Sequence, residues 1–229
     1  DQNLERVLNK GAWTPIERFG ESQYWSGSAA DTDGSFSISR KDKLLGKLNW
    51  NQLGDHNRLN ALAAIAAANH AGVSPQTSIT ALEKFQGVKR RMEIKGVVNG
   101  ITIYDDFAHH PTAIATTIAG LRHRVGNARI LAVLEPRSNT MKQGVWKDDL
   151  AASLRDAEAV FCYTANLGWD AAGALRSLGD KVKTSDDIDA LIKMIKQAVK
   201  TGDQVLIMSN GGFAGIHGKL LAKLKTTTS

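Results

Sequence analysis

The stretch Ile101–Pro111, ITIYDDFAHHP, decides the fold that this sequence predicts. It opens with strand-forming residues, and it then crowds two Asp and two His into six residues. Pro111 follows, and the helical run TAIATTIAGL begins directly after it. Proline favours the first position of a helix. The stretch therefore predicts a strand, a short loop of ionisable side chains and a helix, and open α/β sheets bind their ligands at such strand ends.

Strands and helices alternate from this stretch to the C-terminus. Strands are predicted at 92–98, 101–105, 129–134, 159–163, 181–183 and 204–208, and helices at 112–124, 146–155, 169–178, 186–200 and 216–224. Asn99-Gly100, between the first two strands, is a strong hairpin signal. Continuous apolar strands alternating with amphipathic helices indicate a mostly parallel sheet covered on both faces. We therefore predict an α/β, Rossmann-like domain over residues 89–229.

Residues 1–88 have a different pattern. Short segments of β character at 12–14, 23–25, 35–39 and 44–50 suggest a small antiparallel set, followed by helices at 57–71 and 75–84. The first of these helices is rich in alanine and apolar nearly all round, which predicts burial between layers. Residues 3–8 resemble the end of a helix. We therefore expect the tail of an α/β domain cut from a longer protein, whose exposed edges would allow a dimer.

Composition excludes several classes of protein. Apolar residues make up 42% and charged residues 23% of the 229, which is typical of a globular chain. No apolar run is long enough to span a membrane, and the opening DQNLERVLNK is not a signal peptide. The net charge is +6, but the basic residues are scattered, so we expect neither a nucleic-acid nor a membrane partner. Cys162, the single cysteine, lies in the apolar run AVFCY and predicts a reducing, cytoplasmic location.

The ionisable loop itself allows two interpretations. Asp105 and Asp106 are adjacent in a strand and face opposite sides, so we expect one to point toward a site and the other to cap a helix or face solvent. His109 and His110 share this limitation, and one of them is expected to cap the helix. A metal site would need a second ligand cluster, which the sequence lacks. We therefore predict no metal ligands in this chain.

Polar residues also follow two other predicted strands. Arg137, Ser138 and Asn139 come after RILAVL, and Ser209 and Asn210 come after QVLIM. We expect RILAVL to neighbour the opening strand, and an arginine there suits a ligand carboxylate. The glycines that follow Asn210 are either a connector or a backbone cradle for an anion.

Two further groups have a structural and a functional interpretation. Asn57 and Asn60 lie one turn apart on the alanine-rich helix. Asn57 is either the helix N-cap or a ligand residue, and Asn60 is either a surface residue or a buried amide that an adenine edge could satisfy. Arg90 and Arg91, at the junction of the two regions, are either solvated or reach a phosphate.

Four segments in this order and spacing resemble the Mur ligases, the ATP-dependent ligases of peptidoglycan assembly. They are GDHNRLNALAAIAAA, VKRRMEIKG with NGITIYDDFAHHPTAI, LEPRSNTMK and MSNGGFAGIHGKL, and the resemblance covers about Asn3 to Leu224. It is most similar to the branch that joins UDP-N-acetylmuramate to the murein tripeptide L-alanyl-γ-D-glutamyl-meso-diaminopimelate. The family's UDP-binding domain and phosphate loop have no counterpart here. The resemblance therefore implies the last part of the central ATPase domain (1–88) and the C-terminal domain (89–229), inactive alone.

The resemblance also implies roles for matching positions, with ATP and Mg²⁺ as cofactors and the metal ligands outside this chain. It places His56, Asn57 and Asn60 on the adenine motif, Arg91 against ATP from the junction, and Asp106 on the ribose. His109 falls in the loop that faces the incoming amine. Looser matches place Arg137, Ser138, Asn139, Ser209 and Asn210 on the peptide. A hinge near Gly87–Arg91 would bring Asp106 and His109 to the nucleotide.

Three other functions stay open at this point. The chain could be a stand-alone nucleotide-binding or interaction module, or part of a Mur ligase that adds a single amino acid. A Rossmann oxidoreductase is disfavoured, because no GxGxxG follows the first strand of the predicted sheet.

Overall fold

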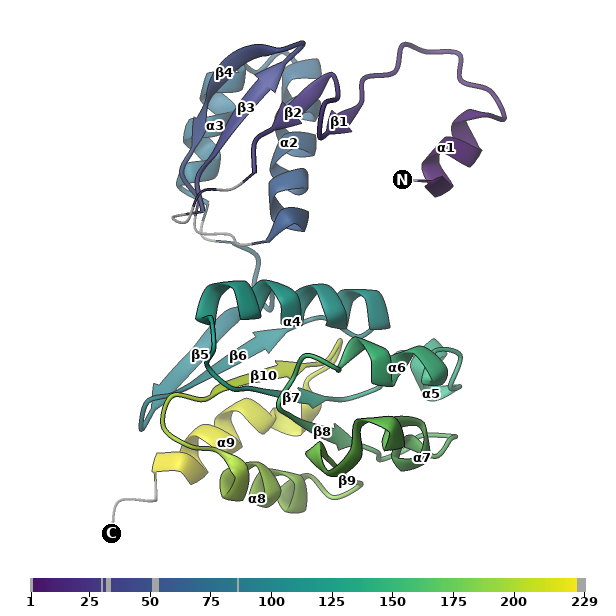
Figure 1. Ribbon diagram of the computed structural model, residues 1–229, viewed down its shortest axis with the longest axis vertical. Coiled ribbons are helices and arrows are strands. Elements are labelled where there is room, and N and C mark those ends of the chain that lie inside the picture. Colours follow the sequence, from purple (N-terminus) through teal and green to yellow (C-terminus); the bar gives the residue numbers. More distant parts are fainter. Residues whose placement is uncertain (1, 30, 32–33, 51–53, 86, 226–229) are drawn as a thin grey trace. The chain divides into compact units, whose positions relative to one another are not determined.

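A computed structural model describes residues 2–29, 31, 34–50, 54–85 and 87–225. The chain divides into two compact units, unit 1 at residues 1–86 and unit 2 at residues 87–229 (Figure 1). The predicted boundary, between residues 88 and 89, lies two residues further on. Each unit has its own sheet and its own hydrophobic core, so each is described by itself.

Unit 2 is built on a six-stranded sheet. Its strands are β5 (Glu93–Val98), β6 (Ile101–Asp106), β7 (Ile130–Leu134), β8 (Ala159–Tyr163), β9 (Val182–Ser185) and β10 (Gln204–Met208). Their order across the sheet is β5-β6-β10-β7-β8-β9, and every neighbouring pair except β5 and β6 is parallel. The predicted α/β class and mostly parallel sheet are confirmed.

Helices cover both faces of this sheet (Figure 1). One face carries α4 (Pro111–Val125), α5 (Asn139–Lys142), α6 (Lys147–Ser153) and α7 (Ala171–Leu175), and the other carries α8 (Ile188–Ala198) and α9 (Ile216–Lys225). Each face has a separate core of buried hydrophobic side chains. The central strand β7 is buried along its whole length, because helices pack on both of its sides.

Local sequence signals account for several turns in unit 2. Asn99 and Gly100 both have positive φ, 53° and 75°, as the tight hairpin between β5 and β6 requires. Pro111 is the first residue of α4, as predicted, and the His110 side chain caps that helix by accepting from Thr112 N. The four-residue helix α5 was not predicted, since it is too short for a periodic pattern, and the predicted helix 169–178 divides into α7 and a 3₁₀ segment, Arg176–Lys181.

Unit 1 has a four-stranded sheet covered by two helices. The strands β1 (Phe19–Gly20), β2 (Trp25–Gly27), β3 (Phe36–Arg40) and β4 (Lys43–Leu48) lie in chain order, and α2 (Asp55–His70) and α3 (Pro75–Glu83) follow. The predicted strand at 12–14 is wrong, and β1 pairs with β2 in parallel, so the set is mixed and not purely antiparallel. Only one face of α2 is buried, at Arg58, Ala61, Leu62 and Ile65, so the predicted burial all round is also wrong.

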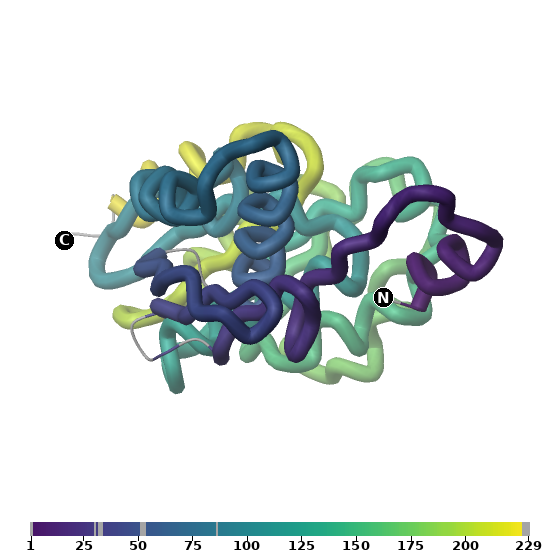
Figure 2. The backbone as a smooth tube through the Cα atoms, turned by 90° about the horizontal axis from the view of Figure 1, so that it is seen from above, coloured from purple at the N-terminus to yellow at the C-terminus, as the bar shows by residue number. Residues whose placement is uncertain are grey.

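Helix α1 (Gln2–Leu8) has no buried residue and stands apart from the rest of unit 1 in both views (Figures 1 and 2). An ion pair between Glu5 and Arg18 links it to the segment before β1. Among the described residues, no helix has the length and apolar content needed to cross a bilayer. Cys162 is fully buried in β8, as expected, and burial raises the pKa of its thiol to about 12.

Candidate functional site

Three strands of unit 2 end in register at the carboxyl ends of the parallel strands, which we call the sheet edge. Asp106 of β6, Met208 of β10 and Leu134 of β7 are in register, and the loops that follow them lie side by side. The backbone continues this pairing one step further, since Ser209 N donates to Asp106 O and Glu135 N donates to Met208 O. The sequence placed β7 next to β6, which is wrong, because β10 lies between them.

Asp106 braces the loop that follows β6. One carboxylate oxygen accepts from Met92 N at 2.8 Å, and the other accepts from Ala108 N at 2.8 Å and from Thr117 Oγ1 at 3.4 Å. The residue is 2% exposed. Burial raises the pKa of this carboxyl, while the two backbone N–H groups and Arg91 oppose the rise. Asp106 thus holds together the start of β5, the loop and α4.

Asp105 faces the opposite side of the sheet and is buried as well. Its carboxylate lies 3.5 Å from Arg90 Nε and 3.3 Å from His217 Nε2 at the start of α9, the latter without the alignment of a hydrogen bond. The expectation that one of the two aspartates would cap a helix or face solvent is therefore wrong. The alternation of faces is confirmed, since Asp106 contacts α4 and Asp105 contacts α9.

Phe107 is the centre of the loop. Its ring lies 5.2 Å from the guanidinium of Arg90 and 5.5 Å from that of Arg91, and the His109 ring meets it edge-on at 5.4 Å. His109 Nδ1 lies 2.9 Å from the Phe107 carbonyl oxygen. Because a carbonyl oxygen only accepts, Nδ1 carries the proton, and in the neutral ring Nε2 presents a lone pair. His109 is thus oriented as an acceptor for an N–H group.

The loop after β10 packs against the loop after β7. Ser209 Oγ donates to Glu135 Oε2 at 2.5 Å and accepts from Gly211 N at 2.9 Å, so its single donor is used inside the protein. The Arg137 side chain lies on Gly211, where any Cβ would overlap the guanidinium. Asn210 Oδ1 is buried without a hydrogen-bond partner among the described residues. Arg137, Ser209 and Asn210 are therefore brought together at the sheet edge.

Ser138 and Asn139 lie at the start of helix α5. Ser138 Oγ accepts from Met141 N and caps α5, and Asn139 is the first residue of that helix, exposed at the surface. Their predicted contact with a peptide is not tested by this arrangement. Arg137 is exposed, and no carboxylate of the described residues lies within ion-pair distance of it.

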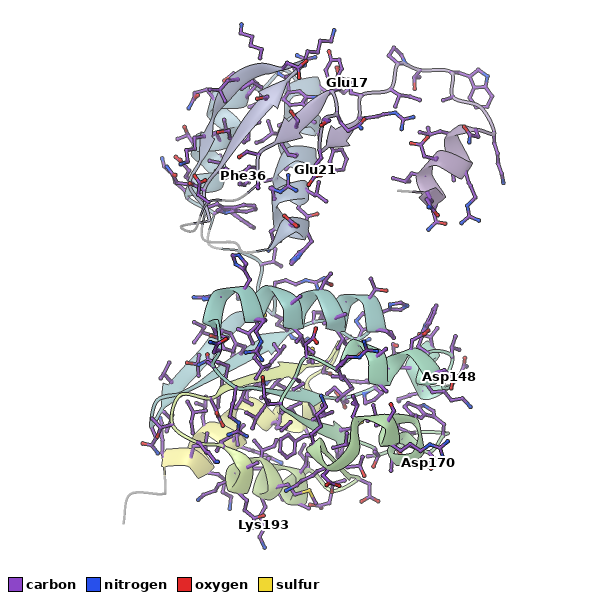
Figure 3. All side chains as sticks on the ribbon, viewed as in Figure 1. Glu17, Glu21, Phe36, Asp148, Asp170 and Lys193 are labelled. Atoms are coloured by element: carbon purple, nitrogen blue, oxygen red, sulfur yellow. The ribbon has the colours of Figure 1, made fainter. Side chains whose placement is uncertain are left out.

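The remaining predicted residues lie on α2 of unit 1. His56, Asn57 and Asn60 all fall in its first two turns, and Gly54 is the N-cap, so Asn57 is not the cap. Asn60 is exposed, so the argument from a buried amide was wrong. Between them, Arg58 is buried and donates to Gly27 O, Asp55 and Glu21, the last of which is labelled in Figure 3. Arg58 thus fixes the first turn of α2 to β2.

Comparison with known proteins places this site in a family. A family model described as Mur ligase, glutamate ligase domain, matches residues 90–211, which is more than half of the chain and lies within unit 2. The chain belongs to the Mur ligase family.

Individual relatives give a finer picture. The UDP-N-acetylmuramate–L-alanyl-γ-D-glutamyl-meso-2,6-diaminoheptandioate ligase of Escherichia coli K12 is 46% identical over 224 residues, covering 96% of this chain and 49% of that protein. The UDP-N-acetylmuramate–L-alanine ligase of Anaeromyxobacter dehalogenans 2CP-C is 30% identical over 231 residues, covering 96% and 49%. A crystal structure of a murein peptide ligase from Psychrobacter arcticus 273-4 superposes with a TM-score of 0.77 at 42% identity, covering 100% of this chain and 50% of that one. The chain spans about half the length of the curated relatives it matches.

Mur ligases use ATP and Mg²⁺, and the two cofactors fit this chain differently. The polar side chains at the sheet edge and on α2 have the donors and acceptors that a nucleotide or peptide needs. In the part of the chain that the structure describes, no three His, Cys, Asp or Glu side chains gather into a metal-binding group. The described residues therefore supply no protein-only cage for Mg²⁺, which proteins usually hold with one or two carboxylates together with waters and substrate phosphates.

Sequence reasoning missed the structural roles of Arg90, Glu135 and His217 in unit 2, and that of Arg58 in unit 1. Arg90 was considered as a solvated charge or a phosphate ligand, yet its donors are used inside unit 2. His217 lies far along the chain from Asp105, and no local pattern joins them. A polar residue inside an otherwise apolar helix face was the only available signal for Arg58.

Proposed function

We propose that this chain is part of an ATP-dependent ligase that joins UDP-N-acetylmuramate to L-alanyl-γ-D-glutamyl-meso-diaminopimelate. Identity of 46% over nearly the whole chain to a ligase of that name supports the substrate pair. The observation that carries the proposal is Arg137, an exposed guanidinium seated on Gly211 at the strand ends. A tripeptide with several carboxylates suits such a cation, because arginine pairs with a carboxylate through two parallel hydrogen bonds.

The proposed reaction has two steps. A carboxylate is a poor electrophile, so ATP first transfers its terminal phosphoryl group to the muramate carboxylate, giving an acyl phosphate and ADP. The amine of the tripeptide's alanine then attacks the acyl carbon and forms the amide bond. The bond between the acyl carbon and the phosphate oxygen breaks, and inorganic phosphate leaves. The phosphoryl-transfer machinery and the Mg²⁺ ligands are proposed to lie outside this chain, which we expect to be inactive alone.

The residues of this chain bind and orient in that scheme. His56, Asn57 and Asn60 would contact the adenine, and Arg91 would meet the phosphates. Asp106 would hold the ribose and also keep its loop in place. His109 would receive an N–H group of the incoming amine on Nε2. The reaction needs cytoplasmic ATP, so we propose a cytoplasmic enzyme.

A second candidate is a ligase that adds L-alanine to UDP-N-acetylmuramate, favoured by 30% identity over a similar length. The two candidate functions differ in the amine substrate, which is the tripeptide in the first and L-alanine in the second. The full-length protein is supplied with ATP, Mg²⁺ and UDP-N-acetylmuramate, and ADP release is followed with the tripeptide, with L-alanine or with neither. We expect release only with the tripeptide, together with the ligated product in the mass spectrum. Release with L-alanine alone would select the second candidate.

Arg137 tests the peptide site directly. Arg137→Met in the full-length protein should raise the KM for the tripeptide by on the order of tenfold, because a charge-assisted pair is lost, while the KM for ATP stays unchanged. Lys147→Met is the control, since it removes an exposed charge on α6. An unchanged tripeptide KM in Arg137→Met would remove Arg137 from the site.

A further inference from the structure

The backbone N–H and carbonyl groups of Arg90 both form hydrogen bonds inside unit 2. Its N–H donates to Glu93 Oε2 at 2.9 Å, and its carbonyl accepts from Phe107 N at 2.8 Å. The hydrogen bond from this N–H is the main reason that the pKa of Glu93 is lowered. The residue has a φ of 60°, which turns the chain sharply. The backbone of Arg90 is therefore held within unit 2 on both sides of the residue.

The Arg90 side chain reaches three segments at the sheet edge. Nη2 donates to Ser209 O at 2.6 Å and to Gly211 O at 2.7 Å, and Nε lies 3.5 Å from Asp105 Oδ2. The plane of the guanidinium packs over Phe107. One side chain thus ties the loop after β10 to the end of β6 and to the loop that follows it.

This combination of partners requires arginine. The two carbonyls and the carboxylate lie around one planar group with five N–H donors, and lysine offers three donors from a single point. The carbonyls of Ser209 and Gly211 flank Asn210. Holding both of them fixes the backbone on either side of that side chain, and it fixes Gly211, on which Arg137 lies.

We propose that Arg90 is a positioning residue that sets the loop Ser209–Gly211 for peptide binding without touching the peptide itself. The identity of the peptide rests on the proposed function, whereas the positioning of the loop does not. Without the Arg90 side chain, the neighbouring strand should stay in place, but the backbone of the loop Ser209–Gly211 should become less ordered. Peptide binding should then weaken through Asn210 and Arg137.

The buried charge of Asp105 provides an independent readout. His217 is on the other side of this carboxylate, and burial lowers the pKa of His217. Lys95 and Arg90 lower it further, whereas Asp105 and Glu93 raise it. Removing the Arg90 cation leaves Asp105 with His217 as its nearby cationic partner, so the pKa of His217 should rise. This rise reports the loss of the Arg90 charge beside Asp105, whereas amide exchange reports on the order of the loop.

The first experiment uses the 229-residue chain. NMR titration of the histidine ring signals, with His217 assigned through His217→Gln, is compared for wild type, Arg90→Met and Arg90→Lys. Amide exchange of Gly211 and Gly212 is measured in the same samples. We expect Arg90→Met to raise the pKa of His217 and to speed exchange at Gly211 by on the order of tenfold, with Arg90→Lys in between. Lys89→Met, which removes the adjacent exposed charge, should change neither.

The second experiment uses the full-length protein and separates the two KM values. Arg90→Met should raise the KM for the tripeptide on the order of tenfold and leave the KM for ATP within about twofold, as expected for an effect confined to the peptide loop. Equal increases in the KM for the tripeptide and the KM for ATP, or no change in either KM, would overturn the positioning role. If the wild-type protein shows no tripeptide-dependent ADP release, the proposed function fails instead. The exchange and titration data then decide the role of Arg90: unchanged exchange at Gly211 or an unchanged pKa of His217 would overturn it.

Discussion

Unit 1 and unit 2 each use an arginine to hold a neighbouring segment against a sheet, a helix in unit 1 and a loop in unit 2, but they bury opposite members of the ion pair. In unit 1 the Arg58 side chain is 6% exposed, and its partners Asp55 and Glu21 are 82% and 83% exposed. In unit 2 the Arg90 side chain is 31% exposed and its partner Asp105 only 8%. The buried member cannot regain water when its partner is removed, so it decides what each substitution costs. Four predictions test this contrast.

The largest effect is expected at Asp106, the buried acid next to Asp105 in unit 2. Asp106→Ala leaves the N–H groups of Met92 and Ala108 without acceptors, which should lower the free energy of unfolding by about 3–4 kcal/mol. Urea denaturation measures it, with Thr117→Val as the control for the longer 3.4 Å contact. In the full-length protein the same substitution should also raise the KM for ATP. Wild-type stability would show that the loop does not depend on Asp106.

The next effect is expected at the buried cation of unit 1. Arg58→Met removes the hydrogen bond to Gly27 O and should lower the stability of unit 1 by about 2 kcal/mol, because hydrogen bonds from charged groups are among the stronger ones. Amide exchange in α2 and β2 reports on this unit alone. Arg58→Lys keeps the charge and should recover part of the loss. Equal stability of Arg58→Met and wild type would mean that packing alone holds α2.

The third prediction concerns pH. Burial holds the pKa of His217 below its usual 6.5, so the folded protein favours the neutral ring. The unfolded chain then binds more protons as pH falls below 6.5, and unit 2 loses stability, by at most about 1.4 kcal/mol per pH unit for one group. Denaturation between pH 7.5 and 5.5, as a difference between wild type and His217→Gln, isolates this contribution. Parallel pH profiles for the two proteins would contradict it.

The smallest effect is expected at an exposed acid of unit 1. Glu21→Gln removes the charge of a carboxylate that is 83% exposed, and the guanidinium of Arg58 keeps its other partners. Surface ion pairs contribute little, so the change in unfolding free energy should stay below about 0.5 kcal/mol. A loss as large as that of Arg58→Met would mean that the exposed acid, and not the buried cation, dominates the pair.

The fold of unit 2 could be predicted because its signals are local and repeated. Strands β8 and β10 begin and end at the predicted residues, and Asn99-Gly100 and Pro111 occupy the predicted turn and helix start. Unit 1 was predicted less well. Its strands β1 and β2 have two and three residues, too short for an alternating pattern, and their parallel pairing depends on contacts that no local signal records.

The candidate site shows the same division. The sequence indicated which loops carry polar residues, since polar side chains directly follow three predicted strands. It did not indicate which of those side chains the protein uses internally. Ser209 donates to Glu135, and Asp106 accepts from the backbone N–H group of Met92, and both partners lie in other segments of the chain.

By itself, the sequence determined the α/β class, the alternation of Asp105 and Asp106 across the sheet, and the resemblance to the Mur ligases. These follow from periodicity, turn chemistry and long motifs, each of which is a property of consecutive residues. Only the tertiary structure decided that β10 lies between β6 and β7, and that Arg90, Asp105 and His217 meet. Strand order and buried charge depend on which distant segments pack together, and burial sets the energetic consequence of each charge.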